Sequence, residues 1–193
     1  MSSILVNILV KVIVGCMQYL LKISIDNTDA WRLIAVDGKA DLAHVAKLIA
    51  LSFDYADGKM LFNVKGKDYN AGVAGNTDSV EALTQFDTLS VEFEEEFLFK
   101  IESNPLLTHT VRVMKKDEHL FCLMPSCLVG SGLLPEHDNL TSLKISNYLD
   151  SDEAQSLDLR DVTNRLRAYG STRKDVNEAM VQAGATALNF VQK

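Results

Sequence analysis

Apolar and polar residues alternate along residues 21–25, the second half of an apolar segment at residues 19–25, and this is the first regular pattern in the chain. The residue types found there favour extended backbone, so a strand is predicted over residues 19–25. A turn signal separates it from a second apolar run at residues 31–36, and two strands so closely connected pair antiparallel. Neighbouring side chains of a strand point to opposite faces, and we expect Trp31 to face the core and Arg32 to face outward.

A helical pattern follows the second strand. Asp41 is placed to cap a helix whose apolar residues recur at helical spacing through residues 42–53. Three more strands are predicted farther along, at residues 59–64, at residues 97–99 and in a run that ends near Met114. Together these elements describe a sheet with one principal helix.

The connecting segments are rich in turn-forming residues. Residues 65–77 contain Gly, Asn and Asp and are predicted to be a loop, and residues 78–86 to be a short helix. Asn104-Pro105 is a turn signal, and residues 125–138 hold the other two of the three prolines. We expect this last segment to form an irregular loop at one end of the sheet.

The end of the chain is helical in pattern. An apolar stripe at residues 159–169 stops at Gly170, and a second stripe occupies residues 175–191. These two segments predict a C-terminal helical hairpin, which we expect to pack on the sheet or on a second copy or partner. The predicted fold is therefore α+β, with a mixed, mainly antiparallel sheet of about five or six strands, one principal helix packed on it and this hairpin.

Residues 1–16 differ from the rest because residues 4–14 are almost unbroken in apolar character. They lack the basic start of a secretory signal and the length of about 20 apolar residues that a membrane span needs. Two interpretations stay open: an extra strand, or an extension before a folded unit that begins at Met17. We favour the extension, which gives an organisation of residues 1–16, an α+β core at residues 17–140 and a helical segment at residues 141–193.

Charge and composition narrow the functional classes. Apolar residues make up 47% of the chain, which is ample for a buried core and excludes a disordered protein. The net charge of −7 argues against direct nucleic-acid binding, which relies on clustered Lys and Arg. Three cysteines without disulfide-framework spacing indicate reduced thiols and a cytoplasmic protein. The acidic run at residues 94–96 is interpreted as a solvated turn rather than a metal site, since adjacent carboxylates repel.

The order of several features resembles a known family. These features are Trp31-Arg32, the helix at residues 42–53, the aromatic strand at residues 97–99, the run from His109, and residues 125–136 with Cys127 and Glu136. In this order the chain is similar to the Ri-plasmid open-reading-frame-three-like family, which includes passenger proteins of mobile elements, over about residues 17–138. The resemblance implies a fold without an established activity. Where the family carries its Tyr-Asp-Phe-Gly-Asp signature, this chain has residues 99–103, which lack the two aspartates.

Cysteine and histidine residues near the prolines suggest two kinds of chemistry. A zinc site would need His119, Cys122, Cys127 and His137, but the spacing lacks the tight pairs of zinc motifs. Nucleophilic catalysis would use Cys127 with His109 as base and Asp138 to orient the base. The structural alternative, in which the cysteines are small buried hydrophobes and His109 hydrogen-bonds a neighbouring strand, is favoured over both.

The function expected from the sequence is that of a small binding or accessory protein of plasmid or mobile-element type, without metal or cofactor. Its candidate binding residues are Trp31, Arg32, His109, Cys127, Glu136 and Asp138. Two alternatives stay open: a small enzyme that uses the His109, Cys127 and Asp138 loop, or an acidic decoy that engages a nucleic-acid-binding protein. We expect a protein partner or self-association through the C-terminal helices, and no membrane association.

Overall fold

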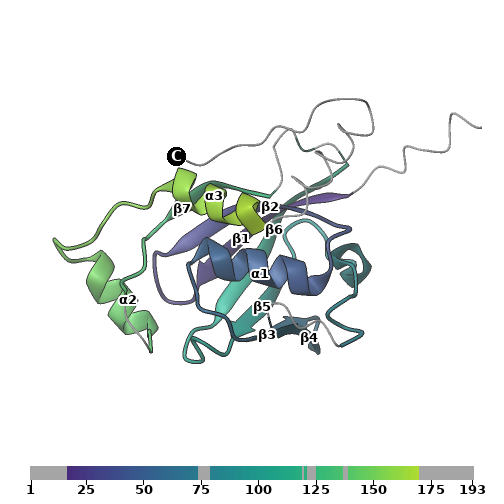
Figure 1. Ribbon diagram of the computed structural model, residues 1–193, viewed down its shortest axis with the longest axis horizontal. Coiled ribbons are helices and arrows are strands. Elements are labelled where there is room, and N and C mark those ends of the chain that lie inside the picture. Colours follow the sequence, from purple (N-terminus) through teal and green to yellow (C-terminus); the bar gives the residue numbers. More distant parts are fainter. Residues whose placement is uncertain (1–16, 74–78, 119, 121–124, 137–138, 170–193) are drawn as a thin grey trace, which may run out of the picture.

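A computed structural model describes residues 17–73, 79–118, 120, 125–136 and 139–169. Seven strands form one sheet in the order β4-β3-β5-β6-β1-β2-β7, and every pair of neighbours is antiparallel (Figure 1). With three α-helices, the protein has the α+β fold that the sequence predicts. The elements, in chain order, are β1 (Gln18–Ile25), β2 (Trp31–Asp37), α1 (Leu42–Ser52), β3 (Lys59–Val64), β4 (Lys67–Val73), the 3-10 helix η1 (Phe86–Leu89), β5 (Glu96–Ile101), β6 (His109–Asp117), β7 (Ser126–Ser131), α2 (Ser142–Leu149) and α3 (Leu159–Tyr169).

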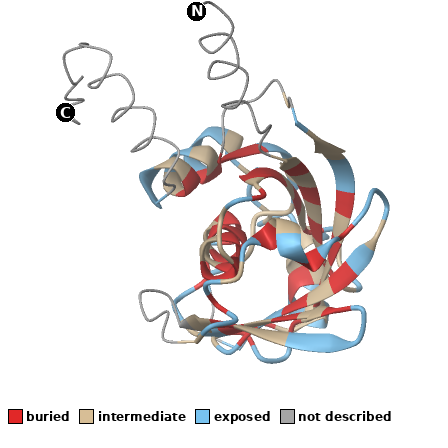
Figure 2. Cartoon of the chain, turned by 90° about the vertical axis from the view of Figure 1, so that its right-hand side faces the viewer, coloured by how far each residue is buried: buried red, intermediate tan, exposed pale blue. Residues whose placement is uncertain are grey.

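Helix α1 is the centre of the core. The sheet curves around it, and buried residues of the sheet face the helix (Figure 2). The Asp41 side chain caps the helix as predicted, accepting a hydrogen bond from the backbone N–H of His44 at 2.7 Å. In β1, every second residue is buried, so the period-two pattern seen in the sequence is the one that packs on α1.

The edges of the sheet differ from the prediction. Residues 65–77 were expected to form a loop, but Lys65 and Gly66 instead form a tight turn, with φ of 53° and 77°, from which β4 runs back along β3. Positive φ at both central residues matches the twist of a hairpin, and glycine allows it freely. At the other edge, the expected irregular loop at 125–138 contains strand β7, which pairs with β2. Both strands form because their backbones pair with a neighbouring strand, β3 or β2. The pattern of apolar residues in the sequence gives no sign of this pairing.

The helical expectations are met in part. The helix predicted at residues 159–169 is α3, and it packs against β7 and α1. Helix α2 was not predicted, and the short helix expected at residues 78–86 is instead a series of turns followed by η1. Residues 1–16 and the second stripe at 175–191 lie outside the described residues.

The orientation predicted for Trp31 and Arg32 is wrong. Arg32 is 1% exposed and lies on the inner face, whereas Trp31 is partly exposed on the outer face, beneath the Lys22 ammonium at 4.9 Å. Arg32 shares the parity of Ile34 and Val36, which are both buried in the core. The strand must place all three on one face, and this constraint overrides the ordinary preference for burying tryptophan rather than arginine.

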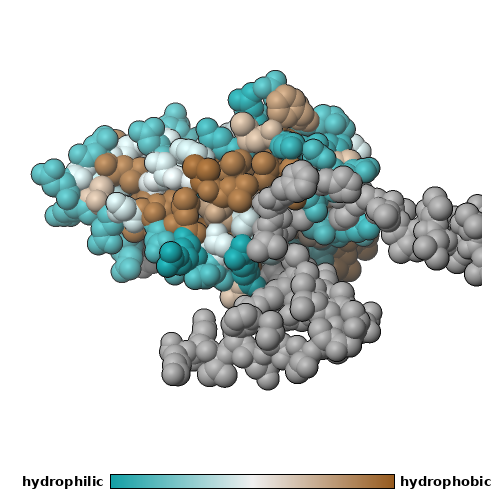
Figure 3. Space-filling view, turned by 90° about the horizontal axis from the view of Figure 1, so that it is seen from above, coloured by the Kyte–Doolittle hydropathy of each residue, from teal (hydrophilic) through white to brown (hydrophobic). Residues whose placement is uncertain are grey.

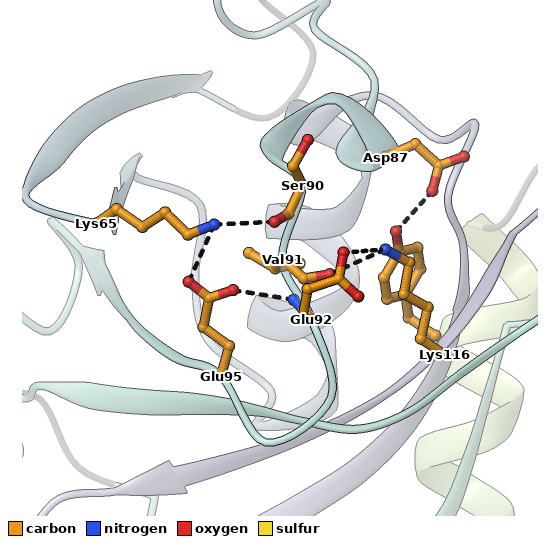
Figure 4. Close-up of polar contacts among 8 residues, drawn as sticks. Lys65, Asp87, Ser90, Val91, Glu92, Glu95 and Lys116 are labelled. Carbon is orange, nitrogen blue, oxygen red and sulfur yellow. Dashed lines mark hydrogen bonds and ion pairs between the residues drawn. The ribbon is translucent and has the colours of Figure 1, made fainter.

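Four glutamates that follow η1, Glu92, Glu94, Glu95 and Glu96, each pair with a cation. Lys65 donates to the Ser90 carbonyl and pairs with Glu95, while Lys116 pairs with Glu92 (Figure 4). The Glu95 carboxylate also accepts the backbone N–H of Glu92, and this hydrogen bond is the main reason its pKa lies below the usual value. Within the acidic run at residues 94–96, Arg112 pairs with Glu94 and Glu96, while Lys65 pairs with Glu95. The run is thus a turn that leads into β5 and is held by cations, in agreement with the solvated-turn interpretation.

Candidate functional site

A cleft of about 790 Å³ opens where α1 ends. Five of its lining residues are buried: Arg32, Phe53, Tyr55 and Asn104, which we call the floor, and Leu140, which belongs to the wall. Its walls and mouth come from the segment after β7, from α2 and from residues beyond α2. The remaining lining residues are Asp54, Ala56, Ser103, Leu133, Leu134, Pro135, Glu136, Tyr148, Glu153, Gln155 and Arg165.

Arg32 is held at the floor by backbone carbonyls. Its Nε donates to Ser52 O at 2.9 Å, and its Nη1 donates to Trp31 O and Ser131 O at 2.9 and 2.6 Å. Its Nη2 donates to Gly132 O at 2.9 Å. Gly132 has a φ of +73°, and a Cβ there would lie 2.9 Å from the Ala30 Cα, so a glycine is needed for the carbonyls to turn toward Arg32.

The charge of Arg32 has no carboxylate partner among the described residues. Ser52 is the last residue of α1, so the negative end of the helix dipole supports the guanidinium, and the Phe53 ring lies 4.6 Å from Cζ. Burial lowers the pKa of Arg32 to about 10, which leaves it protonated at neutral pH. A guanidinium has five N–H groups, of which four are bonded, so one N–H on Nη2 remains available.

Two neighbouring polar groups also lack partners. Asn104 is 8% exposed, and its carboxamide makes no hydrogen bond to another described residue. The Ser103 Oγ is buried without a partner. Both residues belong to the turn between β5 and β6, in which the Asn104 backbone N–H donates to Ile101 O at 3.1 Å. Leaving the buried Ser103 hydroxyl unpaired costs about 1 to 3 kcal/mol, a cost that a bound ligand would remove, whereas the Asn104 carboxamide is not fully buried.

His109 lies behind the floor rather than in the cleft. Its Nδ1 lies 3.3 Å from Phe99 O, which can only accept, so Nδ1 carries the proton and Nε2 accepts the Tyr55 hydroxyl at 2.8 Å. The ring is fully buried, and burial lowers its pKa to about 4. The expected hydrogen bond from His109 to a neighbouring strand is confirmed, and its effect is to hold Tyr55 in position.

Cys127 and His109 do not meet. β6 and β7 are separated by β1 and β2, and three strand spacings of about 4.8 Å place the two backbones about 14 Å apart. Burial raises the pKa of the Cys127 thiol, which therefore stays protonated at neutral pH. Asp138, His119, Cys122 and His137 lie outside the described residues. In the part of the chain that the structure does describe, no three potential metal ligands come together.

Of the residues singled out in the sequence, Arg32 and Glu136 line one cleft, although 104 positions separate them. Trp31 lies on the other face of the sheet, and Cys127 lies beside Arg32, whose charge acts on its thiol. Tyr55 and Asn104 were not predicted as floor residues. A signal was present for Asn104, because it stands in a turn before proline, but nothing local shows that this turn faces Arg32.

The described part of the chain contains no helix that is long and apolar enough to cross a membrane.

Fold and cleft together define a small α+β protein in which a curved antiparallel sheet surrounds one helix and carries a cleft at the end of that helix. No protein-family model matches the chain, and no curated protein matches it. The structure resembles the crystal structure of MM3350, a protein of unknown function from Methanosarcina mazei Go1, with a TM-score of 0.57 and 18% identity over 76% of this chain and 97% of that one. At this identity the likeness establishes the fold and indicates no activity.

Proposed function

We propose that the chain is a small non-enzymatic binding protein whose cleft takes a small molecule that carries an anionic group. The observation that supports this proposal is the buried Arg32 guanidinium, which lines the cleft without a carboxylate partner among the described residues. Buried charges are ordinarily paired, because removing a charge from water is costly. A ligand carboxylate would supply the missing charge at low local dielectric.

The groups around Arg32 suit such a ligand. The free N–H of Arg32, the Asn104 carboxamide and the Ser103 hydroxyl can all donate hydrogen bonds. A carboxylate accepts several hydrogen bonds through its two oxygens, so one anionic group could satisfy more than one of these donors. The floor is preorganised, since backbone carbonyls already fix the guanidinium.

The chemistry of the neighbouring residues favours binding over catalysis. A general base must reach the proton that it removes, whereas His109 is fully buried and already accepts the Tyr55 hydroxyl. The thiol of Cys127 is 5% exposed and protonated, so it is a poor nucleophile. The order of the features from Trp31 to Glu136 supports the further proposal that the chain is a divergent member of the Ri-plasmid open-reading-frame-three-like group, acting as a cytoplasmic accessory protein.

The proposal can be tested by ¹H–¹⁵N NMR of the full chain with hexanoate, and with hexylamine as the oppositely charged probe. We expect hexanoate to shift the Arg32 Nε–H and the Asn104 side-chain amide, and hexylamine to leave both unchanged. Shifts from hexanoate that cluster away from the cleft, or no shifts at millimolar hexanoate, would contradict the proposal.

Matched variants separate binding from folding. Ser103→Ala removes a buried unpaired hydroxyl, so it should leave stability unchanged or raise it while weakening hexanoate binding. Asn104→Leu removes a carboxamide that bonds no other described residue, so it should change stability little and also weaken hexanoate binding. Ser126→Ala is the control, because the Ser126 Oγ is also buried without a partner but lies outside the cleft. Ser126→Ala should change the stability as Ser103→Ala does, and it should bind hexanoate with the affinity of the wild type. Equal hexanoate affinity in all three variants would rule out the cleft as the site.

A further inference from the structure

The cleft has opposite charges at its two ends. Arg32 provides a positive charge at the floor, while Glu136 and Glu153 line the cleft as exposed residues at its mouth. Neither glutamate forms an ion pair with a described residue. A simple anion would use the floor alone, and these two carboxylates would stay in contact with water.

The other cation of the cleft is already engaged. Arg165 pairs with Asp161 at 2.8 Å and with Asp54 at 3.6 Å, and its Nε donates to Leu51 O at 3.3 Å. These contacts tie α3 to the end of α1 and occupy the charge of Arg165. The positive charge at the floor and the negative charges at the mouth therefore stay separate, and both are available to a ligand.

Apolar side chains form part of the wall between the two ends. Leu133, Leu134 and Leu140 line the cleft, and the first two follow Gly132 just after β7. Seen from above, the molecule also carries an apolar area with hydrophilic residues along its visible edges (Figure 3). The volume of about 790 Å³ lies within the range of pockets that hold a ligand of many atoms, and a cube of that volume has an edge of about 9 Å. An extended tripeptide spans about 10 Å.

We propose that the ligand is a short peptide, bound with its C-terminal carboxylate at Arg32 and its amino group near Glu136 and Glu153. Its apolar side chains lie against the leucine wall. This inference rests on the proposed function, since it assumes that Arg32 receives an anionic group. It adds the chemical class of the ligand and its direction in the cleft.

The Asn104 carboxamide favours a peptide over other anions. It offers both a donor and an acceptor, which matches the N–H and C=O of a peptide group. A fatty acid would fill the apolar wall and pair with Arg32 but would make no contact with the Asn104 acceptor or the mouth carboxylates. A phosphate would engage neither the wall nor the mouth. Of these ligands, only a zwitterion with amide groups between its charged ends contacts Arg32, the leucine wall, Asn104 and the two glutamates at the mouth.

The test is calorimetric titration of the full chain with the tripeptide Leu-Leu-Leu and two capped forms. Amidation of the C-terminus should weaken binding by about 10- to 100-fold, as expected when a charged hydrogen bond to Arg32 is lost. N-acetylation should weaken it by about fivefold, because the contact with the mouth is exposed and screened.

A double variant, Glu136→Gln with Glu153→Gln, identifies the partner of the amino group. Both side chains are exposed, so folding should be unaffected, and the variant should lose affinity for the free tripeptide but none for the N-acetylated form. Glu118→Gln is the matched control, since Glu118 is exposed and outside the cleft, and it should bind every form like the wild type. Equal loss for the free and acetylated peptides would contradict the proposed direction.

The two proposals fail in different ways. If hexanoate shifts Asn104 but no tripeptide form binds, or if acetylation does not weaken binding, the peptide inference is wrong and the anion-binding function stands. If neither hexanoate nor any tripeptide form perturbs the Arg32 Nε–H or the Asn104 amide, both proposals are wrong.

Discussion

Replacing Arg32 with methionine tests how strongly one side chain joins three parts of the fold. Methionine keeps an unbranched apolar stem and removes the guanidinium. Four carbonyls would lose a donor: Ser52 at the end of α1, Trp31 in β2, and Ser131 and Gly132 at the end of β7. The variant therefore separates the contribution of this charged centre from that of ordinary packing.

The expected loss follows from the burial of each bond. The bond to Ser52 O is fully buried, and an unsatisfied buried acceptor costs about 2 kcal/mol. The other three are partly buried, so water can replace Arg32 there, and each costs about 0.5 to 1 kcal/mol. The variant also avoids the cost of burying a guanidinium, which offsets part of the total. We expect a net loss of about 2 to 3 kcal/mol.

Urea unfolding followed by circular dichroism measures this difference, and an unchanged slope would show that the same cooperative unit unfolds. Arg32→Lys should lose at least half as much, because one ammonium cannot reach four carbonyls placed around the edge of the planar guanidinium. Arg160→Met, at an exposed position, should stay within about 0.5 kcal/mol of the wild type. An Arg32→Met variant as stable as the wild type would refute the view that Arg32 joins β2, β7 and α1.

Two further predictions concern the buried titratable groups. The pKa of folded His109 is about 4 against a usual 6.5, so the unfolded chain binds the proton more tightly, and stability should fall as pH drops from about 6.5 to 4 by up to about 3 kcal/mol. His109→Gln should flatten the curve of unfolding free energy against pH in that window, and an unchanged curve would disprove the assignment. Cys127 should resist iodoacetamide in the native protein and react in urea, as followed by peptide mass spectrometry, because its thiol is buried and protonated. Rapid labelling at neutral pH without denaturant would show that this strand opens.

Local pattern was sufficient to predict the elements that pack around the core. Apolar residues alternate along β1 and recur at helical spacing after Asp41, because each of these elements buries one face. A pattern of this kind can be recognised in the sequence alone. The helix at 159–169 was found for the same reason. Strands β4 and β7 were missed because their formation depends on pairing with β3 and β2, and hydrogen bonds between strands leave no periodic trace in a short edge segment.

The sequence by itself determined the fold class, the central helix and the strands that face it. The two-residue spacing along β2 also places Arg32 on the same buried face as Ile34 and Val36. The general preference for burying tryptophan rather than arginine predicted the opposite orientation. Only the tertiary structure decided the cleft, because its members come from β2, the end of α1, the β5–β6 turn and the segments after β7 and α2. Such convergence depends on sheet order and curvature, which are set by long-range pairing. No local pattern of residues encodes which distant turns will meet.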